Sequence, residues 1–432
     1  MLTILKIAGL ILEQFGSLLA DELFWVILLI LIFIYRKSAD MENRMLGRSY
    51  SMPGKVSSSV FVGLAGGMAG SLLVILVGIS MEDHTKTGGG SMMEALTYIW
   101  IIAILLAMVN PRYLCFSYAG GIVALMSLLF GFPSVNVPGL MALIGVLHLV
   151  ESLLIWLDGS SYSVPLFLKR KAGETVGGYA MNRVWPIPLV VFAVAAGAPG
   201  SSGTSIAGLI DMPGWWPFLK HAAADGGSGL IYLPLMVPVV LGYGDMAVTR
   251  TPVQKCRISA ARLGCYSIVL IILSVLASKL RLFAFAAAVF APAAHELLIH
   301  YGSKEENEGD ACFAAGQDGI KVLYVKKDSV ADKMGIKPGD TILAANGIPT
   351  GNEEQLSEFL CRYPAFVWLD IRKPDGRLVT AEHADYRNGI NSLGALVVPR
   401  NAQLYYEINN GNSPLKRLID WLRGKHDKNL GV

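Results

Sequence analysis

The charged residues of this chain are unevenly distributed, and this asymmetry limits its possible folds more than any other feature. Residues 1–300 contain 34 charged side chains, whereas the 132 residues from 301 to 432 contain 35. Soluble proteins are about 25% charged, so only the second part has a soluble composition. The sequence therefore predicts a membrane domain at 1–300, a soluble domain at 301–400 and a C-terminal tail at 401–432.

Nine apolar stretches approach the length of about 20 residues that a helix needs to cross a bilayer. They are residues 18–35, 57–80, 95–110, 113–132, 137–157, 185–200, 229–247, 262–279 and 282–300. Some are short or interrupted by Gly and Pro, so we expect a polytopic α-helical bundle of about eight or nine spans. Residues 2–16 are amphipathic and are expected to lie on the membrane surface or against the bundle.

Lys and Arg gather in alternate loops of the predicted bundle. The basic loops are 36–56, 158–184 and 248–262, and the loops between them are 81–94, 133–136 and 201–228. Cytoplasmic loops carry the excess of Lys and Arg. The pattern therefore predicts a multi-pass protein of the plasma membrane with its N-terminus outside and its soluble domain in the cytoplasm.

The soluble domain shows short elements from Gly319 onward. An alternating strand at 320–324 is followed by a short helix that Asp328 or Ser329 can cap and that Gly335 ends. The later segments are a strand at Thr341–Ala345, an Asn346-Gly347 turn, a helix at Glu353–Arg362 and two strands at Val367–Arg372 and Leu378–Glu382. This order predicts a small α+β domain.

This order, with the run Ala331-x-x-Met334-Gly335-Ile336-x-x-Gly339-Asp340, resembles bacterial PDZ domains of the circularly permuted kind. The resemblance implies a groove in which an extended peptide adds as a strand beside the long helix. The expected peptide-binding residues are Leu393, Gly394, Ala395, Leu396, Val397, Leu356, Phe359 and Leu360. The alternative is that residues 392–398 only close the core of the domain.

A PDZ domain beside membrane spans also suggests a site-2-type intramembrane metalloprotease or a regulator of one. Such a protease needs two histidines four residues apart on one helix. His295 and His300 are five apart, about 140° around a helix. Moreover, Leu157-Asp158-Gly159, which resembles the aspartate motif of those proteases, precedes the histidines instead of following them. This function is therefore kept only as an alternative, and we expect no enzyme.

His148 and Glu151 lie three residues apart in an apolar span and share one helix face. They fit either a structural hydrogen bond, which we favour, or an ion pathway in a transporter with a regulatory PDZ tail. The cysteines show no C-x-x-C pair and imply neither a zinc site nor disulfides. We expect no metal or cofactor, although a hidden site would use His148, Glu151, His295 and Glu296.

The whole arrangement is similar to MinJ-type division-topology proteins of Gram-positive bacteria, in which a polytopic bundle leads through a junction such as Ala291–Glu296 to a PDZ domain. The resemblance implies a membrane-anchored adaptor at septa and poles that positions DivIVA-like and MinD-like division proteins. Peptide segments or C-termini would be bound. A short amphipathic helix at 414–423, with an apolar stripe flanked by basic residues, could dock on lipid or on the PDZ domain. A net charge of +3 gives no reason to expect nucleic acid.

Overall fold

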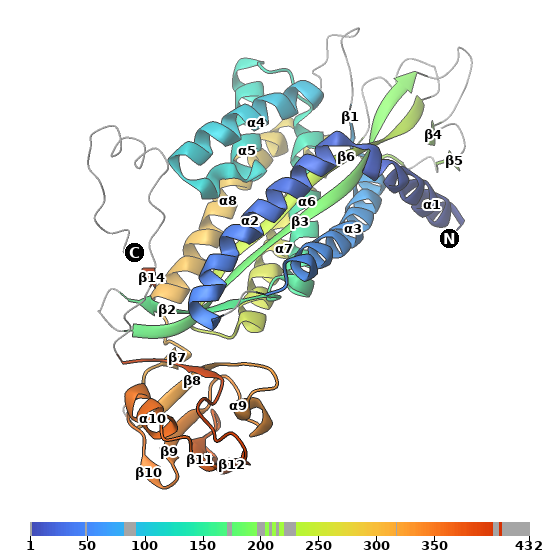
Figure 1. The fold of residues 1–432 in the computed structure, drawn as a ribbon. Coiled ribbons are helices and arrows are strands. Elements are labelled where there is room, and N and C mark those ends of the chain that lie inside the picture. The colour runs from blue at the N-terminus through green and yellow to red at the C-terminus, as the bar shows by residue number, and fades with distance from the viewer. Residues whose placement is uncertain are drawn as a thin grey trace, which may run out of the picture.

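The structure, a computed structural model, describes residues 2–47, 50–81, 92–170, 175–196, 204–206, 210–212, 216–219, 230–316, 318–400 and 406–407. A helical part with a long β-hairpin stands above a small module of strands and short helices (Figure 1). The described helices of the first part are α1 (Leu2–Gly16), α2 (Glu22–Leu46), α3 (Met52–Val77), α4 (Met92–Val109), α5 (Phe116–Phe130), α6 (Val137–Asp158), α7 (Pro252–Ala277) and α8 (Arg281–Glu308). The helix α8 continues past residue 300.

Local signals set where these helices begin. Asp21, Ser51 and Asn136 each precede a helix and accept a hydrogen bond from its first turn. Thr251 and Gln254 form a reciprocal capping box at the start of α7. Proline follows the cap of α3, α6 and α7, where its missing N–H costs nothing.

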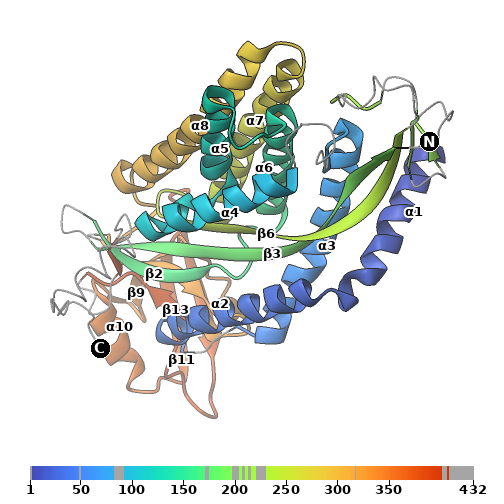
Figure 2. The same cartoon turned by 90° about the horizontal axis from the view of Figure 1, so that it is seen from above.

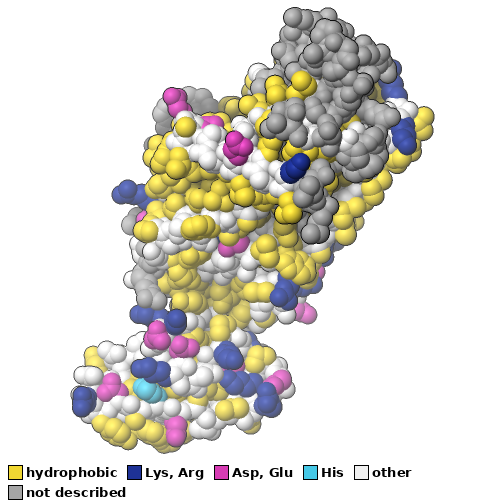
Figure 3. Space-filling model, turned by 90° about the vertical axis from the view of Figure 1, so that its right-hand side faces the viewer, with side chains coloured by type: hydrophobic (Ala, Val, Ile, Leu, Met, Phe, Trp, Pro, Cys, Tyr) yellow, Lys and Arg dark blue, Asp and Glu magenta, His cyan; other side chains and the backbone are white. Residues whose placement is uncertain are grey.

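The expected number of eight or nine spans is not supported. Among the described residues, α3, α6, α7 and α8 are long and apolar enough to cross a membrane. A fifth span would be α1 and α2 together, which are bent by 72° at a short break, whereas α4 and α5 are shorter apolar helices. Many large apolar side chains on the helices nevertheless remain exposed (Figure 3), as expected of a surface that faces lipid.

Two of the predicted spans are wrong, because residues 185–200 and 229–247 fall largely on strands. These strands are β3 (Thr175–Ala196) and β6 (Leu230–Ala247), which pair antiparallel from Tyr179–Ala247 to Ala196–Leu230. A long apolar run is compatible with a buried strand as well as with a helix, so hydropathy cannot separate the two. The prolines in these runs disfavour a helix interior and are tolerated in strands only where their missing N–H is not needed.

The helix α3 covers one edge of this hairpin. An ideal Cβ at Gly63 would lie 2.1 Å from the carbonyl oxygen of Pro186, and one at Gly67 would lie 2.5 Å from that of Pro188. The Ser71 hydroxyl accepts a hydrogen bond of 2.9 Å from the backbone N–H of Val190. The glycines thus let α3 lie where a neighbouring strand would otherwise lie, and a side chain of α3 accepts a hydrogen bond from the edge of β3. Backbone polar groups in an apolar environment need such partners.

Figure 2 shows β3 and β6 between the layer of α1, α2 and α3 and the helices α4 to α8. Buried ion pairs join the elements at the end of the bundle that carries the module. Lys55 of α3 pairs with Glu42 of α2, and Lys255 of α7 lies 3.2 Å from Glu306 of α8. Lys55 and Lys255, which come from two of the predicted basic loops, thus lie in buried ion pairs.

The module contains a sheet of order β12-β11-β9-β8-β13, with β10 paired to β9. Its elements are β8 (Ile320–Val325), α9 (Val330–Lys333), β9 (Thr341–Ala345), β10 (Ile348–Pro349), α10 (Glu353–Leu360), β11 (Phe366–Arg372), β12 (Leu378–Ala384) and β13 (Ala395–Val397). The predicted order of elements is confirmed. Ser329 caps α9, and Gly335 follows it with φ of +72°.

The module packs on the near end of the hairpin sheet. That sheet also contains β1 (Ser80–Met81), β2 (Val164–Lys169), β4 (Thr204–Ile206), β5 (Ile210–Asp211), β7 (Phe313–Ala314) and β14 (Tyr406–Glu407). The linker strand β7 pairs with β3, the Tyr179 hydroxyl donates to the carbonyl of Leu323, and Leu323 and Val398 join the apolar core of the first part. The predicted tail helix at 414–423 lies outside the described residues.

Candidate functional site

The strand β13 is an edge strand of the module among the described residues, since its one paired neighbour is β8. The carbonyl of Gly394 accepts a hydrogen bond from the backbone N–H of Lys326, which follows β8. The N–H of Val398 donates a hydrogen bond to the backbone carbonyl of Lys321 in β8. Because the two groups of a trans peptide point in opposite directions, the N–H of Ala395 and the carbonyl of Val397 face away from β8. This edge therefore offers a donor and an acceptor to an added strand.

Apolar side chains of α10 and β13 share one cluster in the module. Leu356 and Leu360 are 6% exposed each and belong to its core, while Phe359 is half-buried against it. Ala395 and Val397 pack against the same cluster and are also half-buried. The parts of the predicted site that keep accessible apolar surface are therefore Phe359, Ala395 and Val397, whereas the two leucines of α10 mainly support them.

Leu396 points to the other side of β13. It packs against the cores that contain β3 and β2 residues of the first part, as does Val398, instead of joining the module cluster. Successive side chains of a strand face opposite sides, so the alternation separates Leu396 from its neighbours Ala395 and Val397. The predicted residue Leu396 thus helps to dock the module, and only its backbone lies along the candidate groove.

The loop before β13 is held in a defined shape. Gly394 has φ of +69°, and an ideal Cβ there would lie 2.4 Å from the Cβ of Ser329. Leu393 is buried and its carbonyl accepts from Ala331 of α9. Because any side chain at Gly394 would be strained, substitution there changes the fold as well as the groove and is not a clean test of binding.

A turn at 385–389 leads into this loop. The Asp385 carboxylate accepts the backbone N–H groups of Arg387 and Asn388 at 3.1 and 3.0 Å. These hydrogen bonds, with that from Asn388 contributing most, lower the pKa of Asp385 below its ordinary value. The chain turns here from the far edge strand β12 toward β13 at the opposite edge.

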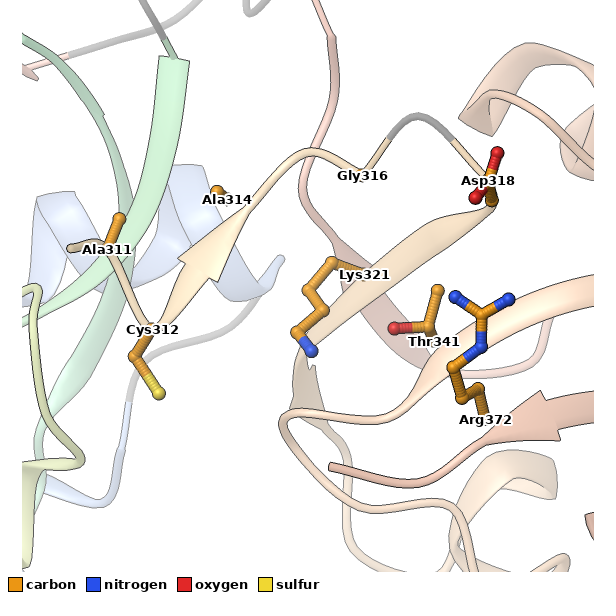
Figure 4. A pocket seen from close by; sticks show the side chains of 8 residues that line it. All are labelled: Ala311, Cys312, Ala314, Gly316, Asp318, Lys321, Thr341 and Arg372. Atoms are coloured by element: carbon orange, nitrogen blue, oxygen red, sulfur yellow. The ribbon is translucent and has the colours of Figure 1, made fainter. Parts of the chain in front are cut away.

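A separate polar pocket of about 250 Å³ lies at the junction of the two parts. Figure 4 shows Lys321, Thr341 and Arg372 from three strands of the module, with Cys312 of the linker across from them. This pocket lies on the linker side of the sheet and contains none of the residues predicted to bind peptide.

The histidines of the first part are arranged differently from what the site-2-type pattern requires. The helix α8 is continuous through His295 and His300, and His300 is exposed while His295 is half-buried. His148 does not form the predicted hydrogen bond with Glu151, because its two ring nitrogens contact the Ile144 carbonyl and Cys115. The Glu296 carboxylate accepts hydrogen bonds from the guanidinium of Arg112 and the hydroxyl of Tyr118.

Cys115 is a neighbour that the sequence analysis missed. Its Sγ lies 3.0 Å from Nε2 of His148 and 3.7 Å from Nε2 of His295. The three residues come from the N-cap of α5, from α6 and from α8. No local spacing signals such a set, since the residues are separated by 33 and 147 positions along the chain.

The comparisons with known proteins agree with this architecture. A family model described as PDZ domain matches residues 321–362. The chain is similar to "Cell division topological determinant MinJ" of Bacillus subtilis (strain 168), at 25% identity over 261 residues, which cover 60% of this chain and 62% of the relative. It is also similar to "Probable cell division topological determinant MinJ" of Lacticaseibacillus paracasei, at 24% identity over 193 residues, which cover 43% of this chain and 53% of the relative.

The resemblance to MinJ-type proteins that the sequence suggested is therefore confirmed. The chain spans less than two thirds of the length of these relatives.

Proposed function

We propose that this protein is a membrane-anchored adaptor whose PDZ module binds peptide segments or C-termini of cytoplasmic cell-division proteins. The observation that carries the proposal is the open edge of β13, where the N–H of Ala395 and the carbonyl of Val397 face away from β8 and the side chains share an apolar cluster with α10. A peptide that adds there would bind through its main chain, and the apolar surface of Phe359 and Val397 would select its side chains.

The membrane part supports this function by raising the local concentration of the module near other membrane-bound proteins. We propose the plasma membrane, with the N-terminus outside and the module in the cytoplasm, and with enrichment at septa and poles. The similarity to proteins named as division topological determinants supports this location. DivIVA-like and MinD-like proteins are the proposed partners, and no catalytic step is required of the chain.

The test replaces Ala395 by proline, which removes the outward N–H but none of the hydrogen bonds to β8. In dividing cells, the fluorescent wild-type chain should collect at septa. The Ala395→Pro variant should stay in the membrane but spread evenly over it.

Ala395→Ser, which keeps the N–H, is the matched control and should localise as the wild type does. Leu378→Ala serves as a second control, because Leu378 is an exposed apolar residue on β12 at the far edge of the sheet. Septal enrichment of the proline variant equal to that of the wild type would rule out strand addition at β13.

A further inference from the structure

Three potential metal ligands converge in the helical part. Cys115, His148 and His295 each offer one ligand atom, a sulfur or a ring nitrogen, and these three atoms all lie within 4.8 Å of one another. A tetrahedral zinc ion holds sulfur and nitrogen ligands roughly 3.5 Å apart, given bond lengths of about 2.3 and 2.0–2.1 Å. The two observed sulfur–nitrogen distances, 3.0 and 3.7 Å, lie on either side of that value.

The outer hydrogen bonds of both imidazoles orient their inner nitrogens toward the sulfur. His148 Nδ1 lies 2.7 Å from the Ile144 carbonyl, which can only accept, so Nδ1 carries the proton and Nε2 has a free lone pair. This is the arrangement that metal-binding histidines commonly show, with the outer N–H bonded to a carbonyl or carboxylate.

His295 is oriented by a longer chain of partners. The Tyr118 hydroxyl donates to Glu296 at 2.7 Å, and Glu296 also accepts from Arg112 at 2.8 Å. Since its proton is directed to Glu296, Tyr118 can only accept from His295 Nδ1, which lies 3.3 Å away. His295 Nε2 is then unprotonated as well, and it faces Cys115.

The three inner atoms therefore have too few protons to satisfy one another. Two imidazole lone pairs face a single thiol, which can donate one hydrogen bond. The thiol lies nearer to His148 Nε2, so the Nε2 atom of the half-buried His295 is left without a donor, and an unsatisfied polar group inside the protein is costly. A bound cation would accept all three lone pairs, with the thiol deprotonated. From this geometry we propose that Cys115, His148 and His295 form a site for a transition-metal ion.

The surroundings hold the three ligands in place. Ser117 and Tyr266 both donate to the backbone carbonyl of Ala291, at 3.0 Å each, and so fasten α5 and α7 to α8 one turn before His295. The Tyr266 ring packs edge-on against both histidine rings. This packing limits rotation of the imidazoles, which a preformed site requires.

The ligand set favours zinc among the common cellular ions. One thiolate and two imidazoles suit Zn²⁺ or copper and do not suit Mg²⁺ or Ca²⁺, which prefer oxygen. Three protein ligands leave one tetrahedral position for water or another ligand. An adjacent pocket of about 340 Å³, lined in part by Tyr118 and Glu296, leads from the surface to the partners of His295. The ion would connect α5 and α6 to α8, the helix that leads to the PDZ module.

The test uses the full chain, purified in detergent with an affinity tag that contains no histidine. The metal-free protein should bind one equivalent of Zn²⁺. Co²⁺ should give the charge-transfer band of a thiolate ligand, which Cys115→Ser abolishes. His295→Ala should remove stoichiometric binding, and Tyr118→Phe should weaken it by about tenfold or more, because it removes the partner that orients His295.

Two matched variants control for other sulfur and imidazole groups. Cys265 is exposed on α7 and His300 is exposed on α8, so Cys265→Ser and His300→Ala should bind as the wild type does. Binding that persists in Cys115→Ser with unchanged affinity and spectrum would overturn the proposal. Where a variant fails to fold, the spectrum of the Co²⁺-loaded wild-type protein tests the proposal, and the lack of a thiolate charge-transfer band in it would overturn the proposal.

Discussion

A buried polar cluster near the module end of the bundle shows how single side chains stabilise this fold. Asp158 at the end of α6 accepts hydrogen bonds of 2.8 Å from Arg183 and from the indole of Trp185, both on β3. Arg183 also donates to Tyr35 and Ser58 of neighbouring helices. Arg183 and Trp185 are fully buried and Asp158 is 6% exposed, so each depends on the others for its partners.

Asp158→Ala should therefore destabilise the protein strongly. The substitution leaves the buried Arg183 guanidinium without its counter-ion, which costs about 3–5 kcal/mol in comparable cases. Thermal unfolding in detergent should show a large decrease in Tm. Glu358→Ala is the control, because it breaks the exposed pair with Arg362 and should change stability by at most about 1 kcal/mol. Equal Tm values for the two variants would contradict this account.

Gly63 lets α3 lie close against the hairpin. Gly63→Ala should destabilise the fold by about 1–3 kcal/mol, because its Cβ would overlap the backbone carbonyl oxygen of Pro186. Gly54→Ala in the same helix meets only ordinary contacts at 3.5 Å or more and should be neutral or slightly stabilising. Thermal unfolding of both variants measures the difference. A Gly63→Ala variant as stable as Gly54→Ala would show that α3 can move away from β3.

Among the elements of the membrane part, the β3–β6 hairpin differs most from the predicted α-helical bundle. A hairpin whose outer edges were bare would leave backbone groups unsatisfied in an apolar environment. Here Tyr35 of α2 contacts both the N–H and the carbonyl of Val184, and Ser71 of α3 satisfies Val190. Helices with small and hydroxyl side chains thus cover β3 along the length where it passes α2 and α3.

The turn at 385–389 gives the module a pH dependence whose sign follows from the lowered pKa of Asp385. Its ionised form stabilises the folded state fully above the unfolded-state pKa of about 3.9. This contribution is lost as the pH falls through the lower folded-state value. Asp385→Asn keeps an acceptor for Arg387 and Asn388 but does not titrate. The wild-type Tm should therefore fall more steeply than the Tm of Asp385→Asn below about pH 4, and parallel profiles would disprove the role of the charge.

In the molecule as a whole, the PDZ module is attached by more than a linker. The strand β7 pairs with β3, and Leu396 of β13 and Val398 just after this strand pack against residues of the first part. One face of β13 is thus used for docking, while its edge away from β8 pairs with no strand among the described residues. A peptide bound at that edge would lie next to a strand that also contacts the membrane part, so binding and docking share one element.

Tyr179→Phe should loosen this attachment, because it removes the hydroxyl that donates to the Leu323 carbonyl of the module. Limited proteolysis should cleave the variant faster between α8 and β8, at residues 309–319, than the wild type. Tyr363→Phe on the exposed surface of the module is the control and should be cleaved at the wild-type rate. Unchanged cleavage of Tyr179→Phe would show that the strand pairing and the apolar contacts hold the module without this hydrogen bond.

Local properties were sufficient to predict the two-part composition and the module. Charge density, alternation at 320–324, the cap at Ser329 and the turn glycine at Gly335 each depend on neighbours a few residues away. The order of elements in the module and the similarity to MinJ-type proteins followed from them. Local properties did not predict which side of β13 Leu396 faces, because that side depends on the surface of the membrane part on which the module docks.

The remaining features depend on segments that meet only in the folded chain. An apolar run such as 185–196 is compatible with a helix or a strand until it pairs with 230–241. Cys115 has no significance in the sequence, and it becomes a potential ligand because α5, α6 and α8 pack together around it. Periodicity and composition record the environment of each residue, but they do not record which distant residue provides that environment.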